Sequence, residues 1–240
     1  MGINMAIKRT TTTHLKSFER KDPEAVIYDV SRPECVTITI PAASQWTSGA
    51  HWHETHTEYL QILQGRALVR LGQAARELGP GDDVIEVPMF TVHEWHRVKD
   101  DNGDEDLIVR EWTVPEDGQK EVFFRMLNSV LTEERPSSLY TTPRFMPQWV
   151  GRWIERWIVM MQLFAIFRAG DNWPVFVGGK TSTNGDSPGL LGWVVTHVIL
   201  YVGSWVGYVL GLRSQYGEYV TDEMLDKGKT AKKSESRKGK

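Results

Sequence analysis

A short stretch of the chain, His51-Trp52-His53-Glu54-Thr55-His56-Thr57-Glu58, concentrates side chains that bind metal ions. His51 and His53 are two residues apart, so on a β-strand their imidazoles point to the same face. Glu58 follows His53 at an odd offset, which requires a bend before its carboxylate can join them. His93 would arrive from a later strand. Imidazole nitrogens and a carboxylate oxygen with open coordination positions suit iron, manganese, nickel, copper or zinc.

The spacing of these residues resembles the first sequence motif of the cupin family. That motif reads G-x5-H-x-H-x3or4-E-x6-G. His51, His53, Glu58 and Gly65 match its core, whereas Gln45 stands where the motif has its leading glycine.

The second cupin motif, G-x5-P-x-G-x2-H-x3-N, is matched more loosely. Gly81, Pro88 and His93 occupy its positions, with one extra residue between the first two. Phe90 replaces the second glycine of the motif, and Arg97 replaces its asparagine.

The resemblance covers roughly residues 35 to 115 and implies a mainly β fold, a single cupin built as a small β-barrel or jelly roll. It also implies a metal held by His51, His53, Glu58 and His93, with His56 in reserve. Iron is the first expectation, with manganese, nickel, copper or zinc as alternatives. Because cupins host many reactions, the resemblance leaves the reaction class open.

Side chains near these ligands are candidates for proton transfer. Glu86 and Glu111 lie in apolar strands, and either could face the cavity as an acid or base. A solvent-facing strand position is the alternative for both. Tyr59 flanks a ligand and could shape the pocket, although core packing is an alternative role. The predicted catalytic set is therefore Glu58, Glu86, Glu111 and Tyr59.

Short strands separated by Gly, Pro and Asp turns favour an all-β barrel, and the pattern changes after Pro115. Val36, Ile38 and Ile40 alternate with threonines, which is typical of a half-buried strand. Gln64-Gly65-Arg66 predicts a hairpin turn between two strands. We expect an N-terminal arm (1–24), a barrel (25–116), a covering helix and linker (117–148), a hydrophobic helical region (149–212) and a basic, disordered tail (213–240).

The stretch Gly189–Leu212 carries no formal charge when His197 is neutral. Gly203, Gly207 and Gly211 repeat every four residues, which gives a smooth helix face for close packing. We interpret the stretch as a membrane helix, and a buried helix of a hydrophobic appendage is the alternative. With residues 149–168 it would form a helical hairpin in the membrane, or a monotopic insertion that never crosses.

Charge and cysteine content indicate the side of the membrane. The segment Lys227–Lys240 has seven basic residues and one acidic residue, which favours the cytosol. The single cysteine, Cys35, excludes an internal disulfide and fits a reducing compartment, and no signal peptide is evident. We therefore expect the barrel and the tail to face the cytosol. A net charge of −3 gives no case for nucleic acid.

The layout as a whole resembles fungal cupin-domain oxidoreductases of polyketide secondary-metabolite pathways. This resemblance implies oxidation or rearrangement of a small lipophilic, polyketide-derived intermediate, with membrane lipid as a second partner. Cupins commonly dimerise, so a homodimer is also expected. Two alternatives stay open: a non-redox isomerase or cyclase that uses the metal as a Lewis acid, and a membrane-tethered binding module without catalysis.

Overall fold

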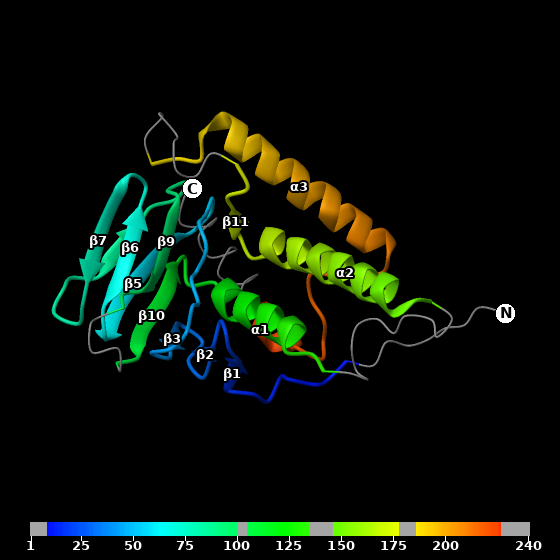
Figure 1. Cartoon of the computed structure of the whole chain (residues 1–240), viewed down its shortest axis with the longest axis horizontal. Coiled ribbons are helices and arrows are strands. Elements are labelled where there is room, and N and C mark those ends of the chain that lie inside the picture. The colour runs from blue at the N-terminus through cyan, green and yellow to red at the C-terminus, as the bar shows by residue number, and fades with distance from the viewer. Residues whose placement is uncertain (1–8, 100–104, 135–145, 178–185, 227–240) are drawn as a thin grey trace.

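A computed structural model describes residues 9–99, 105–134, 146–177 and 186–226. Within these residues the chain is mainly β, with two antiparallel sheets (Figure 1). Three helices lie beside the sheets: α1 (Gln119–Leu131), α2 (Gln148–Ala169) and α3 (Gly189–Val209).

The first sheet has six strands in the order β1-β2-β3-β10-β5-β8. Their bounds are β1 (Ser17–Arg20), β2 (Val26–Asp29), β3 (Val36–Ile40), β5 (Thr57–Gln64), β8 (Ile85–Val87) and β10 (Leu107–Val114). Residues 17–20 of the predicted N-terminal arm form the edge strand of this sheet, because β1 pairs with β2, and an edge strand is the other interpretation that the sequence allows.

The second sheet has five strands in the order β11-β4-β9-β6-β7. Their bounds are β4 (His51–Trp52), β6 (Ala67–Leu71), β7 (Ala74–Leu78), β9 (His93–Arg97) and β11 (Trp173–Pro174). β11 comes from the segment between α2 and α3, so the helical region completes the sheet that carries His51 and is not a separate unit.

The core is formed by alternate strand residues that point between the sheets. In β3, Val36, Ile38 and Ile40 are buried, as the alternation predicts, while the intervening threonines are partly exposed. Full burial of such a side chain stabilises the fold by about 1.5–3 kcal/mol. α1 covers this core with its Phe123 and Met126 side chains.

The hairpin predicted at Gln64-Gly65-Arg66 is wrong. β5 pairs with β10 and β8, whereas β6 pairs with β7 and β9, so the chain crosses from one sheet to the other at this point. Gly65 has a φ of 72°, and a Cβ there would lie 2.6 Å from the backbone oxygen of Asp106. Only glycine fits this crossing without strain.

The structure also corrects the prediction that the chain is disordered from residue 213 onward. Tyr216, Tyr219 and Val220 are buried in the main core. The Tyr219 hydroxyl donates a hydrogen bond to the Glu133 carboxylate. Residues 213–226 are therefore part of the folded protein, while the basic run 227–240 lies outside the described residues.

α2 and α3 lie side by side as a helical pair (Figure 1). A Cβ on Gly203 would lie 2.3 Å from the ring of Phe164, and one on Gly207 would lie 3.5 Å from the Cβ of Met161. Two of the predicted glycines thus allow close packing, while Gly211 follows the end of α3 with a φ of 85°. Within the described residues, α3 is the one helix long and apolar enough to cross a membrane by length and composition.

Candidate metal centre

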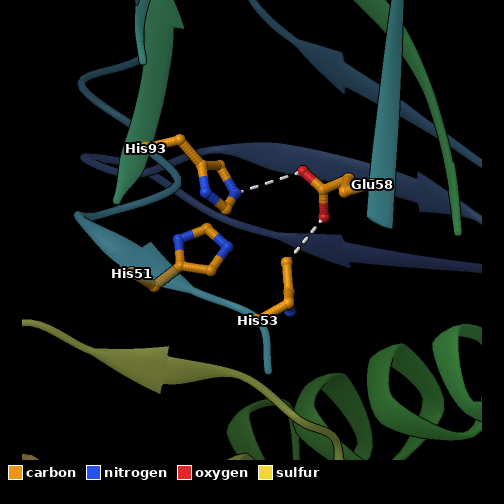
Figure 2. Close-up of side chains that lie close together, drawn as sticks. All are labelled: His51, His53, Glu58 and His93. Carbon is orange, nitrogen blue, oxygen red and sulfur yellow. Dashed lines mark hydrogen bonds and ion pairs between the residues drawn. The ribbon is translucent and has the colours of Figure 1, made fainter. Parts of the chain in front are cut away.

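The side chains of His51, His53, Glu58 and His93 converge inside the barrel (Figure 2). One ligand atom from each lies within 4.8 Å of all the others. His53 Nε2 is 3.0 Å from one Glu58 oxygen, and His93 Nε2 is 3.3 Å from the other. All four side chains are buried, with exposed fractions of 6% or less.

The two sheets bring these groups together from opposite sides. His51 on β4 is directly paired with His93 on β9, and their ring centroids are 4.2 Å apart. Glu58 lies on β5 in the other sheet, so the chain bends between His53 and Glu58. This is the bend that the odd offset of Glu58 requires.

Backbone carbonyls fix the tautomer of each histidine in the group. The Nδ1 atoms of His51, His53 and His93 lie 2.8, 2.6 and 3.1 Å from the carbonyl oxygens of Gly49, Asp171 and Thr91. Since a carbonyl only accepts, each Nδ1 carries a proton and donates it. In the neutral ring each Nε2 then carries the lone pair that a metal ligand requires, and those of His53 and His93 face the Glu58 carboxylate.

The residues present fit a divalent metal ion. His93 Nε2 and Glu58 Oε1 are buried and, apart from their 3.3 Å contact with each other, have no hydrogen-bond partner among the described residues, and such atoms call for a ligand. Burial and the nearby His93 and His53 rings lower the pKa of His51 well below its usual value, which keeps it neutral. Burial acts to raise the pKa of Glu58, but Lys120 and His53 bring it well below its usual value. Neutral imidazoles and an ionised carboxylate are the states that a metal needs.

His56, the reserve ligand, lies outside this group. Its Nδ1 is 2.9 Å from Asp171 Oδ2, and its Nε2 is 3.4 Å from Asp117 Oδ2. Burial acts to lower its pKa, but the two carboxylates prevail and raise it to about 9. His56 is thus a buried imidazolium between two acids, and a protonated ring cannot bind a metal.

Asp171 connects the helical region to the metal-site segment. It lies between α2 and β11 with a φ of 52°. Its carboxylate accepts hydrogen bonds from the backbone N–H groups of Glu54 and Thr55 at 3.0 and 2.8 Å, and from Trp173 Nε1 at 2.9 Å. Its carbonyl oxygen holds His53 Nδ1. The loop that carries His53 and leads to Glu58 is therefore fixed from a distant part of the chain.

Lys120 on α1 bridges two buried carboxylates. Its ammonium contacts Glu58 and Glu111. Burial, followed by the neighbouring Glu58, raises the pKa of Glu111 to about 7. Burial acts to lower the pKa of Lys120, but the two carboxylates raise it above its usual value. The trio places a charged lysine and a readily protonated acid next to the candidate metal ligand.

A cavity of about 310 Å³ opens beside the four-residue group. The polar residues of its wall are His51, Glu111, Arg20, Glu24, Thr47, Ser48 and Asn172. Most of the rest is apolar and comes from the barrel, α1, α2 and the segment that leads into β11. These residues are Tyr28, Ile38, Trp46, Phe123, Phe124, Leu127, Leu131, Leu163, Phe167 and Pro174. A cavity with a mainly apolar wall and a smaller set of polar groups is typical of a small-molecule site.

Of the remaining predicted catalytic residues, Glu111 lies at the site, whereas Tyr59 and Glu86 lie elsewhere. Glu111 faces the interior, as one interpretation of its strand allows. Tyr59 and Glu86 are opposite each other in the β5–β8 register and point to the outer face, because neighbouring Glu58 and Val87 point inward. Tyr59 stacks on Trp112 at 5.6 Å, and Glu86 is exposed. The structure does not bring these two side chains to the site.

Comparisons with known proteins add only distant likenesses. A scan against protein-family models and a search of curated proteins each find no match. Among solved structures, a capsular polysaccharide assembling protein, CapF from Staphylococcus aureus, is 17% identical over 40% of this chain and 29% of its own, with a TM-score of 0.33. A predicted oxalate decarboxylase from Thermotoga maritima is 16% identical over 45% of this chain and 96% of its own, with a TM-score of 0.33. KdgF from Halomonas sp. is 17% identical over 43% and 91%, with a TM-score of 0.31.

The chain thus spans less than a third of the length of CapF, although it spans nearly all of the other two. Likeness at these TM-scores assigns no activity. The case for function therefore rests on the geometry of the centre and on the cupin-like spacing of its residues.

Proposed function

We propose that this protein is a metal-dependent cupin oxidoreductase that acts on a small lipophilic compound. The observation that carries the proposal is the convergence of three histidine nitrogens and the Glu58 carboxylate beside a mainly apolar cavity. His51 belongs both to this group and to the cavity wall. A substrate in the cavity would therefore lie next to the ion.

His51, His53, His93 and Glu58 would hold the ion, and iron is the first candidate. A bound redox metal with open positions would supply dioxygen chemistry or polarise a substrate oxygen. The backbone carbonyls orient the three imidazoles, Lys120 keeps Glu58 ionised, and the aromatic wall excludes water. Glu111 can hold a proton at the cavity wall near neutral pH.

The cavity wall indicates the class of substrate. Side chains such as Trp46, Phe124 and Phe167 suit a flat, apolar molecule with one or two oxygens for the polar end. A polyketide-derived intermediate of secondary metabolism has this character, as the cupin resemblance implies. We also propose that the protein associates with the cytosolic side of a membrane, into which such compounds partition.

A non-redox isomerase or cyclase is the second candidate, and Glu111 is the observation that favours it. A buried carboxyl group with a pKa of about 7 suits proton transfer at neutral pH, which is what isomerisation requires. In this case the metal would only polarise an oxygen of the substrate.

The test is to load the purified full chain with Fe²⁺ and incubate it with a panel of small phenols and aromatic ketones, in air and without oxygen. Mass spectrometry of the products separates the candidates. An oxidoreductase gives products with added oxygen or lost hydrogen only in air. An isomerase gives products of unchanged mass in both conditions.

The test variant is His93→Ala, which removes a proposed metal ligand without changing a residue that lines the cavity. The proposal predicts that this variant loses turnover under every condition. Turnover by His93→Ala equal to that of the wild type would contradict it. Binding of panel compounds without turnover, at full metal occupancy, would favour a binding module instead.

A further inference from the structure

One side of α3 is an apolar stripe that the described structure leaves largely exposed, apart from the Tyr201 ring, which lies near the Arg168 guanidinium and the rings of Trp173 and His197. Leu190, Val194, Val198, Tyr201, Trp205 and Tyr208 follow each other at helical spacing and are 40–78% exposed. The helix carries no Asp, Glu, Lys or Arg between Gly189 and Val209. At a rise of 1.5 Å per residue, its 21 residues are about 31 Å long. The stripe runs along this whole length.

The opposite side of α3 is bound to the barrel near its start. Trp193 Nε1 donates a hydrogen bond to Glu54 Oε1 at 2.7 Å, and the ring of His197 stacks between Trp173 and Trp193. The hydroxyl of Thr196 donates to the carbonyl oxygen of Pro174 at 2.9 Å. These contacts fix the first half of the helix on the sheet that holds the candidate centre.

The second half of α3 is bound to α2. Gly203 and Gly207 receive the side chains of Phe164 and Met161. α2 is itself packed on α1 and the core through Phe167 and Ile166. α3 therefore contacts the rest of the protein along its whole length. One of the groups that it contacts is the ionisable side chain of Glu54.

These contacts are incompatible with a membrane-crossing helix. A spanning helix would draw Glu54 and the attached barrel edge into the hydrocarbon, where a charged group costs about 2.5–3.5 kcal/mol or more. We propose that α3 is instead an in-plane membrane anchor, with the outward stripe inserted into one leaflet and the barrel standing on the surface. The inference rests on the proposed membrane association and specifies its geometry.

Charge supports a bilayer surface with anionic lipids as the partner. α2 exposes Trp149, Trp153 and Trp157 at intervals of four residues, beside exposed Arg152 and Arg156. Aromatic and basic side chains of this kind are typical of the lipid headgroup region. The sequence that follows the described residues adds seven basic residues between Lys227 and Lys240 against one acidic residue. An uncharged stripe on one helix, together with basic side chains elsewhere in the chain, complements apolar chains below anionic headgroups.

Flotation of the full-length protein with lipid vesicles tests the partner. The vesicles are phosphatidylcholine alone, or phosphatidylcholine with a minor share of phosphatidylserine. We expect the protein to float with both and more strongly with phosphatidylserine. Val198→Glu/Trp205→Glu, which places two charges in the stripe, should reduce binding about tenfold or more. Val84→Glu/Met89→Glu adds the same charges at exposed apolar positions of the barrel and should float like the wild type.

Two flotation outcomes would overturn the proposal. One is that the full-length protein floats with neither vesicle. The other is that the stripe variant floats as well as the barrel variant. A wild-type dimer that does not float, and that the stripe variant converts to monomers, would assign the stripe to a second copy of the chain. None of these readouts depends on metal or turnover, so they stay distinct from failure of the proposed activity.

Label depth separates an in-plane helix from a crossing one. Single cysteines replace Leu190, Val198 or Tyr208 in a Cys35→Ser background, and each carries a nitroxide whose depth in the vesicle is measured by electron paramagnetic resonance. An in-plane helix gives a similar shallow depth at all three positions. A label at Val198 near the bilayer centre, with the other two at opposite surfaces, would contradict the proposal.

Discussion

The imidazole Nδ1 of His53 lies 2.6 Å from the backbone carbonyl oxygen of Asp171, a residue 118 positions further along the chain. The same residue binds the loop after His53 with its carboxylate. The segment between α2 and β11 therefore orients a candidate metal ligand and fixes the backbone next to it. The helical region is part of the centre rather than an addition to the barrel.

Replacing Asp171 with alanine should weaken metal binding, although Asp171 is not itself a ligand. The variant loses every bond of the carboxylate and leaves His56 beside a single acid, so the loop carrying His53 should loosen. Loss of an outer partner of a ligand commonly costs about 10–100-fold in metal affinity. Competition with a chromogenic chelator measures this change.

Asp171→Asn keeps a residue that tolerates positive φ and can still accept part of the hydrogen bonds. We expect the metal affinity of this variant to lie between those of the wild type and Asp171→Ala. Asp222→Ala, at an exposed acid of the C-terminal segment, is the matched control. Equal metal affinity in Asp171→Ala and Asp222→Ala would show that the contact between the two segments does not support the centre.

Lys120→Met should destabilise the protein strongly. It leaves the Glu58 and Glu111 carboxylates buried without their shared cation. Removal of one partner from a buried ion pair commonly costs about 3–5 kcal/mol of unfolding free energy. Urea denaturation of the metal-free protein provides the measurement.

Glu111→Gln supplies the second arm of a double-mutant cycle with Lys120→Met. Removing one of the two carboxylates should make the lysine substitution less costly, so the double variant is expected to be more stable than the sum of the two single changes predicts. Strict additivity would mean that Lys120 and Glu111 are not energetically coupled.

The stability of the metal-free protein should fall between about pH 7 and pH 9 because of His56. The folded state raises the pKa of His56 to about 9, above the value of about 6.5 expected in the unfolded chain. The folded state therefore binds the proton more tightly. This contribution is complete below about pH 6.5 and disappears as the pH rises through about 9.

Midpoints of urea unfolding across this pH range test the assignment to His56. Glu111 titrates lower, at about 7, so it contributes little to the upper part of the range. His56→Gln has no proton to lose there, and its stability should be flatter between pH 7 and pH 9. A decline in the variant as steep as that in the wild type would assign the titration to another group.

The sequence predicts the four-residue group because three of its members lie within one short segment and the cupin-like spacing adds His93. His51 lies in β4 and His53 directly after it, Glu58 is the second residue of β5, and His93 is the first residue of β9. The period-2 pattern likewise predicts the strand that contains Val36, Ile38 and Ile40. Patterns of this kind need only neighbouring residues.

The supporting residues could not be predicted in this way. Lys120 is 62 positions from Glu58, and Asp171 is further still from His53. Each occurs in a polar stretch that is typical of a helix start or a turn, so no local signal marks it.

Gly65 shows a related limit, because a hairpin turn and a crossing between sheets use the same residues. Hydropathy alone also cannot distinguish a membrane-crossing helix from a helix such as α3, which is apolar but is bound to the barrel through the contact between Trp193 and Glu54.

The most direct test of the account is elemental analysis of the protein after purification and reconstitution with Fe²⁺, alongside His51→Ala, His93→Ala and the exposed control His14→Ala. The account predicts about one ion per chain in the wild type and in the control, and almost none in the other two variants at unchanged secondary structure. Full occupancy in both His51→Ala and His93→Ala, or no bound ion in the wild type, would contradict it.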